Sequence, residues 1–436
     1  MLARALTFSP DQDESFFEEL PAAAAIFLLR GEGEPYVSKS ANLRRRLQRL
    51  LGPPREQSKR LNLRDRVHEV EFTVTGSDFE SQFLLYRLLR ETFPKTCAAR
   101  LRLRPAALVK LHLENEYPRA SVTTRLGKVR FVKPDEPSGA KAQSLINPNG
   151  TTEVVPSRET IYQIASGAPG VPARLDGRDA RRSIRNLYYG PFPSRAAAEK
   201  FASDALDFFK MRRCVDDLHP DPAFPGCVYS EMKMCLAPCF KGCTESDYHA
   251  EVARVQAFFD SGGESLTREL AQARDHASTE LAFEDAAAIH AKIEKLKPLL
   301  AQLPEIVKRI DRLAAIVIQP SSQPGSVSVF RFSRGSLSGP VPFSTEPPPG
   351  SGSMESRIEE TIHSSLIPDI KSSLERMEHL AILKRWYYRS SRIGEIFFAD
   401  EKGMWPLRRI VRGIGRVYHG EKEQGLATFS AAPEAM

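Results

Sequence analysis

Four cysteines near the middle of the chain restrict the local fold more than any other sequence feature. They are separated by twelve, seven and three residues, and they are Cys214, Cys227, Cys235 and Cys239. Four thiolates can complete a tetrahedral Zn²⁺ site or hold a [4Fe-4S] cluster. Because the spacing lacks the paired short knuckles of zinc fingers, we expect a [4Fe-4S] cluster, with Zn²⁺ as the alternative. Cys243 could replace one ligand, and Cys97 is expected to be an ordinary core thiol.

Length and charge set limits on the architecture and on the partners. A chain of 436 residues is long enough for several packed domains. Its 62 Lys and Arg residues exceed its 55 Asp and Glu residues, giving a formal charge of +7 that favours polyanionic partners. No stretch approaches the roughly 18 apolar residues that a membrane span needs, and no secretory signal follows Met1. We therefore expect a cytoplasmic protein without membrane contact.

Hydrophobic periodicity predicts an α+β multidomain fold. Short apolar stretches at 24–29 and 67–74 indicate strands. The patterns at 42–51 and 78–92 indicate helices, and Pro94 closes the second one. This order of elements within a short stretch predicts one compact α/β unit at the N-terminus.

Turn, linker and cap signals divide the rest of the chain. The predicted elements are strands at 108–125, a turn at Tyr189-Gly190-Pro191, a helix capped by Ser194, helices at 245–259 and 265–300, strands at 311–345, a linker at 347–350 and a helical segment at 354–388. The predicted units are an α/β domain at 15–104, a strand-rich connector at 105–212 with an irregular insertion at 127–184, a cysteine-rich segment at 213–245, a helical region with a hairpin at 246–303, a strand-rich unit at 304–345 and a helical, basic tail of unassigned role at 346–436.

The helical pair at 265–300 carries an apolar stripe on each helix. The stripes consist of Leu266, Leu270, Ala277 and Leu281, and of Phe283, Ala286, Ala287, Ile293 and Leu296. A hairpin shorter than about 40 residues buries too little area to be stable alone, so it packs on its own chain or on a partner's hairpin. Periodicity alone favours an ordinary internal hairpin.

Several segments resemble, in the same order, those of the UvrC family of excinuclease subunits. The matching segments are Lys39 to Leu47, Thr75 to Pro94, Tyr189 to Ser194, the four cysteines, Leu281 to Ala287 and residues 311–345. Together they extend over about three quarters of the chain. The resemblance implies a small GIY-YIG-like α/β domain, a Cys-ligated loop segment, a helical UVR hairpin and a strand-rich C-terminal region.

The resemblance also implies roles for residues of the GIY-YIG-like domain. In that family two tyrosines flank the scissile phosphate, an arginine neutralises charge and a glutamate holds a divalent metal. Matching positions are kept by Tyr36, Lys39 and Arg46. The first tyrosine, a motif glycine and the glutamate are replaced by Phe27, Ser38 and Leu85.

These replacements predict that the domain has lost its nuclease activity. A leucine cannot ligate Mg²⁺, which prefers oxygen ligands, so we expect no divalent metal at this site and at most residual cleavage. Glu80 and Glu91 lie five or six residues from Leu85 on the same predicted helix, which places them away from the required position. We assign no catalytic residue. The family's second, RNase H-like nuclease needs more residues than follow 345, so we expect it to be missing here.

The resemblance implies two kinds of partner. DNA is expected to contact a basic group in the first domain, which consists of Arg44, Arg45, Arg46, Arg49, Lys59 and Arg60. A UvrB-type helicase subunit is expected to dock on the UVR hairpin through Leu270, Leu281, Phe283, Ala287 and Ile293.

Three functions are compatible with this sequence. The leading hypothesis is a UvrC-like nucleotide-excision-repair protein that binds DNA and a UvrB-type partner without cutting. One alternative is an active excinuclease subunit that makes a single-strand incision at damaged DNA. Another is a metal- or redox-sensing DNA-binding regulator.

Overall fold

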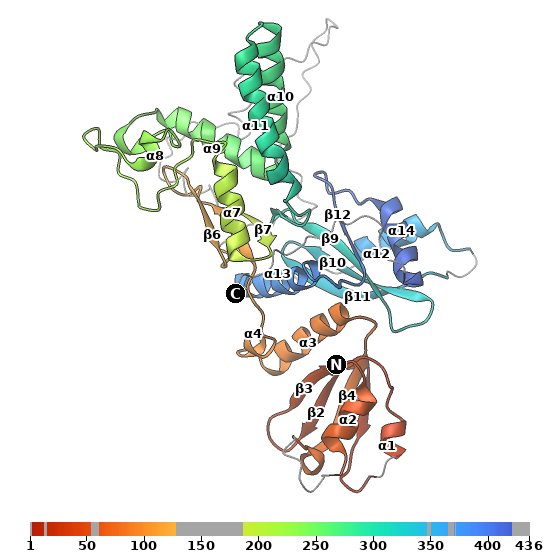
Figure 1. Ribbon diagram of the computed structural model, residues 1–436. Coiled ribbons are helices and arrows are strands. Elements are labelled where there is room, and N and C mark those ends of the chain that lie inside the picture. The colour runs from red at the N-terminus through yellow and green to blue at the C-terminus, as the bar shows by residue number, and fades with distance from the viewer. Residues whose placement is uncertain are drawn as a thin grey trace, which may run out of the picture.

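The computed structural model of the chain describes residues 2–12, 15–53, 61–127, 186–346, 350–364, 370 and 372–420. Within them the fold is α+β, with three four-stranded sheets whose strand pairs are all antiparallel (Figure 1). No helix in the described part of the chain has the length and apolar composition that a bilayer span requires. Residues 128–184 of the insertion predicted at 127–184, and the prolines of the predicted linker, 347–349, lie outside the described residues.

The first sheet has the strand order β1-β4-β2-β3. Its strands are β1 (Arg4–Thr7), β2 (Ala25–Gly31), β3 (Tyr36–Ser40) and β4 (Val67–Val74). Helices α1 (Ser15–Glu18) and α2 (Leu43–Leu51) pack on one face, and α3 (Asp78–Thr92) packs on the other. Successive β2 side chains point to opposite faces, so Phe27 joins the core under α2 while Ile26 joins the core under α3. The predicted order of strands and helices is confirmed, and β1 adds an edge strand.

Helix α3 begins and ends where the sequence predicts. The Ser77 side chain accepts a hydrogen bond from the Glu80 amide at 3.1 Å, which satisfies one free donor of the first turn. Phe93 caps the C-terminal end, one residue before Pro94. A single turn, α4 (Cys97–Arg100), follows. Cys97 is a buried core thiol, as expected, and burial raises its pKa to about 11.

A second sheet joins segments that lie far apart in the sequence, in the order β6-β5-β7-β8. Its strands are β5 (Ala107–Leu111), β6 (Ala120–Thr123), β7 (Leu187–Phe192) and β8 (Lys308–Arg309). Helix α7 (Arg195–Leu206) packs against β5 and β6. The predicted Ser194 cap is confirmed, because its hydroxyl accepts from the Ala197 amide at 3.1 Å.

The predicted turn at Tyr189-Gly190-Pro191 is wrong, because these residues lie inside strand β7. Tyr189 pairs with Val109 of β5 on one side and with Arg309 of β8 on the other. A Cβ atom at Gly190 would lie 2.6 Å from the Leu108 side chain. The glycine therefore permits close approach of two strands, a demand that local sequence cannot distinguish from a turn.

Helices dominate the segment after α7. They are α8 (Val228–Glu231), α9 (Glu245–Asp260), α10 (Glu264–Thr279) and α11 (Phe283–Ala301). The helix predicted at 245–259 and the pair of helices predicted at 265–300 are confirmed. Figure 1 shows α10 and α11 projecting side by side away from the sheets, while the loop around α8 extends in another direction.

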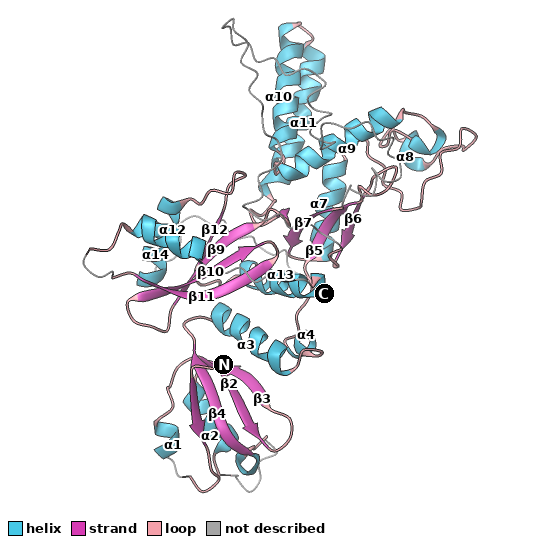
Figure 2. Cartoon of the chain, turned by 180° about the vertical axis from the view of Figure 1, so that it is seen from behind, coloured by secondary structure: helices cyan, strands magenta, loops and turns pink. Residues whose placement is uncertain are grey.

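The third sheet has the order β11-β10-β9-β12 and is covered on both faces (Figure 2). Its strands are β9 (Ala314–Pro320), β10 (Ser326–Ser333), β11 (Ser336–Ser344) and β12 (Glu395–Phe398). Helices α12 (Met354–Ser364) and α14 (Leu407–His419) share one core with it, and α13 (Ser373–Tyr387) packs on the opposite face. The strands predicted at 311–345 are confirmed, and the region predicted as a tail contributes β12 to this sheet.

Helix α3 is packed between the first sheet and the C-terminal region. The Phe79 ring lies 5.0 Å from the Phe330 ring of β10 and 5.1 Å from the Trp386 ring of α13. A Cβ atom at Gly76, just before α3, would lie 2.3 Å from the Pro320 carbonyl oxygen, so only glycine allows this approach.

A buried polar cluster joins α3 to α13. The Tyr86 hydroxyl donates to Glu378 Oε2 at 2.9 Å, and Arg90 Nη1 donates to the same oxygen at 2.7 Å. The imidazole of His379 accepts from the Leu337 amide at 2.9 Å, and burial lowers its pKa to about 3. His379 therefore stays neutral at physiological pH and acts as a fixed acceptor.

We expect Glu378→Ala to lower the free energy of unfolding by about 2–4 kcal/mol, because it leaves the Tyr86 hydroxyl without its acceptor and the half-buried Arg90 with only its longer contact to Glu375. Glu375→Ala is the matched control, because its contact with Arg90 is longer, at 3.4 Å, and more exposed. The control should change stability by less than about 1 kcal/mol. Urea unfolding followed by tryptophan fluorescence measures both. If the two substitutions lower the free energy of unfolding equally, the buried carboxylate of Glu378 contributes no more to stability than the exposed one of Glu375.

Candidate functional sites

Tyr36 and Arg46, two residues for which the resemblance implies GIY-YIG roles, contact each other. Arg46 Nη2 donates to the Tyr36 hydroxyl at 2.8 Å, which links β3 to α2. The Arg46 Nε atom is buried and has no hydrogen-bond partner among the described residues. Phe27, which replaces the first family tyrosine, lies with its ring 6.1 Å from the Tyr36 ring and offers no hydroxyl. This pair can bind an anionic oxygen, but it contains no general base.

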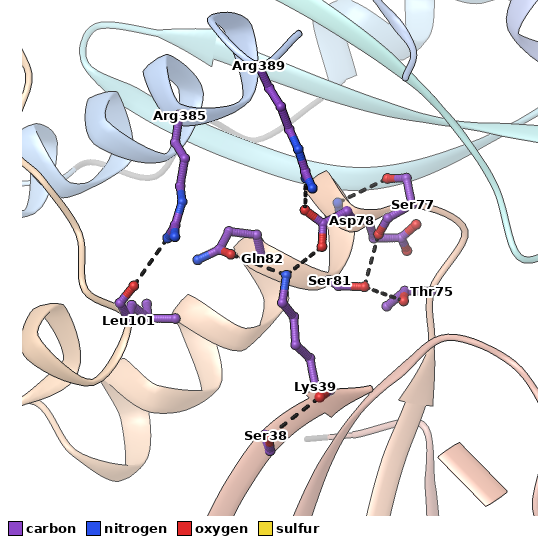
Figure 3. Close-up of polar contacts among 11 residues, drawn as sticks. Ser38, Lys39, Thr75, Ser77, Asp78, Ser81, Gln82, Leu101, Arg385 and Arg389 are labelled. Atoms are coloured by element: carbon purple, nitrogen blue, oxygen red, sulfur yellow. Dashed lines mark hydrogen bonds and ion pairs between the residues drawn. The ribbon is translucent and has the colours of Figure 1, made fainter. Parts of the chain in front are cut away.

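Lys39, the third residue that the resemblance singles out, binds the same carboxylate as Arg389. That carboxylate belongs to Asp78. Lys39 Nζ lies 2.5 Å from Asp78 Oδ1 and 3.3 Å from Gln82 Oε1 (Figure 3). Arg389, two residues beyond the end of α13, places Nη1 2.6 Å from Asp78 Oδ2. Sequence reasoning missed Asp78 and Arg389, because the segments that carry them are some three hundred residues apart and meet only in the tertiary fold.

Leu85 lies in an apolar environment. Its side chain is 8% exposed and belongs to the core that also contains Phe83 and Tyr86. Phe27 and Tyr36 belong to a separate core on the other face of the sheet. A hard divalent cation needs oxygen ligands, and the surroundings of Leu85 consist of hydrocarbon.

The other carboxylates on α3 are directed elsewhere. Glu80 is buried and accepts from the Gly76 amide at 3.0 Å, and burial raises its pKa. Glu80 and Glu91 line a cavity of about 370 Å³, to which Tyr36 does not contribute. Tyr36 lines a different cavity of about 270 Å³ together with Glu32 and Glu34. Within the described residues, no three Cys, His, Asp or Glu side chains converge so as to hold a metal ion.

The basic residues of the first domain divide into two groups. Arg44 is engaged inside the fold, because it donates to the carbonyl oxygens of Leu20 at 2.8 Å and Glu18 at 3.0 Å. Arg45 and Arg49 are exposed on α2 and remain candidates for phosphate contacts. Lys59 and Arg60 lie outside the described residues.

The four cysteines come close enough to influence one another electrostatically. Burial, opposed by the Ala237 amide and increased by the charges of the other three cysteines, raises the pKa of Cys235 to about 11. The Ala237 amide donates to Cys235 Sγ at 3.3 Å. Among the described residues, however, the cysteine side chains do not converge in the geometry of a metal site.

A buried arginine lies beside this cysteine group. Arg212 is 2% exposed, and its Nη1 donates to Cys214 Sγ at 3.3 Å. Its other acceptors are the carbonyl oxygens of Tyr117, at 2.9 Å, and Asp216, at 2.8 Å. A buried cation is costly without an anion, and no carboxylate among the described residues pairs with Arg212. An anionic sulfur ligand at Cys214 would provide the missing charge.

The helical hairpin is anchored at its base and apolar at its tip. Leu266 and Leu296 are buried in the main core, and Ile293 is buried within α11. At the tip, Leu281 is 71% exposed and Phe283 is 64% exposed. Of the other residues predicted to bind a partner, Leu270 is half-buried and Ala287 is exposed.

Comparison with known proteins places these features in a protein family. A family model described as "UvrC/Cho excinuclease, middle domain" matches residues 163–258, which include the cysteine group. "UvrABC system protein C" of Rickettsia africae is 23% identical over 71% of this chain and 39% of its own length. The protein of the same name from Idiomarina loihiensis is 33% identical over 28% of this chain and 19% of its own length. The chain thus matches less than half of the length of these relatives. No solved structure shows significant similarity.

Proposed function

We propose, because this chain belongs to the UvrC family, that it acts in nucleotide excision repair as a DNA-binding subunit whose nuclease-like domain does not cut. The observation that carries this proposal is the position of Leu85 in a hydrocarbon core, where the family resemblance calls for a metal-binding carboxylate. The contact between Tyr36 and Arg46 persists on the other face of the sheet. We therefore expect that this domain still binds phosphate although it no longer cleaves DNA.

Loss of the metal ligand removes most of the means of phosphodiester hydrolysis. A divalent ion neutralises charge on the phosphate and activates the nucleophile, and this domain offers neither that ligand nor a hydroxyl at Phe27. The α3 carboxylates cannot substitute, because Glu80 accepts from the Gly76 amide, Glu91 lines another cavity, and Asp78 is paired with Lys39 and Arg389. The cations that remain, Arg46 and Lys39, suit sequence-independent contacts with the DNA backbone.

The hairpin docks on a similar hairpin of a UvrB-type subunit. Support comes from its tip, which exposes Leu281 and Phe283 at the end of a pair of helices that projects from the molecule (Figure 1). Single exposed apolar residues are common, but two large ones at a projecting turn suit insertion into an apolar groove. The buried base of the hairpin keeps the tip rigid and lowers the entropy lost on binding.

The cysteine group holds a [4Fe-4S] cluster. Zn²⁺ is the alternative, because it can be bound by the same four cysteines. The residues that would hold it are Cys214, Cys227, Cys235 and Cys239. Thiolate ligation of iron confers an electron-transfer or structural centre, and hydrogen bonds to the sulfur atoms adjust its charge. Arg212 and the Ala237 amide supply such hydrogen bonds. Their role is to neutralise and orient the sulfur ligands.

For the nuclease-like domain, we expect no nicking of a damaged duplex by the purified chain with Mg²⁺ or Mn²⁺, because no carboxylate holds the ion near Tyr36. Gel analysis of end-labelled DNA measures the product. Nicking that disappears in Arg46→Ala would establish an active excinuclease subunit. Glu32→Gln would then test whether the carboxylate that shares the Tyr36 cavity supplies the metal ligand.

For the hairpin, we expect Phe283→Ala to weaken capture by a peptide from the C-terminal hairpin of a UvrB-type subunit by about 2 kcal/mol or more, as for an aromatic anchor. Met404→Ala is the matched control, because Met404 is also 64% exposed but lies far along the chain, before α14. Fluorescence anisotropy of the labelled peptide gives both affinities. Equal affinities of the two variants would exclude the tip as the docking site.

For the cysteine group, we expect anaerobically purified protein to contain iron and to show the broad visible absorption of thiolate-ligated iron. Cys235→Ser should lose the metal, whereas Cys97→Ser should keep it because Cys97 is a core thiol far from the group in sequence. Elemental analysis decides the identity. Stoichiometric zinc would replace the iron assignment, and absence of both metals from freshly prepared protein would refute the centre.

A further inference from the structure

Three cations from two distant parts of the chain gather where α13 passes the first sheet. Lys39 comes from β3, Arg385 from the last turn of α13, and Arg389 from the residues just after that helix. In Figure 3 the Arg389 side chain points toward Asp78 of α3, whereas the Arg385 side chain points toward Leu101. Arg385 Nη1 donates to the Leu101 carbonyl oxygen at 3.2 Å, so its guanidinium is held in place.

One carboxylate, Asp78, holds two of these cations together. It accepts from Lys39 through one oxygen and from Arg389 through the other, at 2.5 and 2.6 Å. Burial raises the pKa of Asp78, but the hydrogen bonds and charges of Lys39 and Arg389 outweigh it and hold the pKa below its usual value. Asp78 is therefore ionised at neutral pH. Its two oxygens occupy the place that two oxygens of a phosphate would take between a lysine and an arginine.

The group is accessible and includes an unused donor. The side chains of Asp78 and Arg389 are 56% and 54% exposed, so a ligand can reach them from solvent. Gln82 accepts from Lys39 through its amide oxygen, whereas its Nε2 is buried and has no hydrogen-bond partner among the described residues. This Nε2 atom is covered by the protein, so the groups that a ligand can reach are those of Lys39, Asp78 and Arg389.

We propose that Lys39, Arg385 and Arg389 form a phosphate-binding path for the DNA backbone across the junction of the nuclease-like domain and α13, with Asp78 as an internal counter-ion that a backbone phosphate displaces. This path lies on the α3 side of the first sheet and adds the C-terminal region to the proposed DNA-binding surface. It rests on the proposed DNA binding of this domain. It also assigns a role to a segment that sequence reasoning leaves without one.

The path predicts opposite effects for its anion and its cations. In Asp78→Asn, two cations lose their internal partner, so DNA binding becomes tighter, and the dependence of log K on log salt concentration becomes steeper. In Arg389→Gln and Arg389→Glu, binding becomes weaker, and the salt dependence becomes shallower by about one unit for each lost phosphate contact. If Asp78 serves only to join two parts of the fold, Asp78→Asn instead weakens binding or leaves it unchanged.

The test uses the full chain and a fluorescein-labelled duplex without a lesion, with anisotropy titrations at several KCl concentrations. Lys200→Gln on α7 is the matched control, because it removes an exposed cation that is also paired with an aspartate, Asp204. Urea unfolding of each variant identifies losses of affinity that come from misfolding. Arg389→Glu keeps the test valid if Asp78→Asn is unstable, because Arg389 is exposed and lies outside a helix.

The outcomes separate this path from the proposed function. If the wild-type chain does not bind the duplex, DNA binding itself fails, and the path fails with it. If the wild-type chain binds and Arg45→Gln weakens binding, but both Arg389 variants behave like Lys200→Gln, the path alone is refuted. Tighter binding by Asp78→Asn together with weaker binding by Arg389→Glu supports the path.

Discussion

The burial of α3 between two parts of the chain is the constraint on which the rest of the structure depends. One face of the helix covers the first sheet, while Phe79 and Tyr86 pack against residues of β10 and α13. A helix that is buried on two sides cannot present a solvated carboxylate at those positions without a large desolvation cost. The apolar environment of Leu85 and the closeness of Lys39 to Arg389 are both consequences of this arrangement.

Some arginines of this chain are engaged inside the fold and others remain exposed. A count of charges does not distinguish the two groups. Arg44 binds backbone carbonyl oxygens and holds α2 to the loop before β2. Arg212 is buried beside sulfur, and Arg389 remains exposed at a junction. Because a guanidinium offers five donors, it can close loops internally as readily as it binds phosphate. The positive net charge is therefore only partly available to a polyanion.

Caps and helix-ending prolines predict the bounds of helices well when their contacts lie within a few residues. The bounds of α3 follow from the Ser77 cap and from Pro94, and the start of α7 follows from Ser194, because caps act through hydrogen bonds within a few residues. The turn predicted at Gly190 fails because a glycine also serves close packing of strands, and the partner strand β5 is remote in the sequence. Strand β12 was missed for the same reason, since it is specified by pairing with β9.

The α+β class, most of the elements, the cysteine group and the leucine at position 85 could all be read from the sequence. These depend on periodicity, caps and residue chemistry, which are local properties. Only the tertiary structure decided that Arg44 is engaged, that Arg212 lies beside Cys214, and that Arg389 meets Asp78. Such contacts join segments or orient side chains through packing, and no short stretch of sequence carries that information.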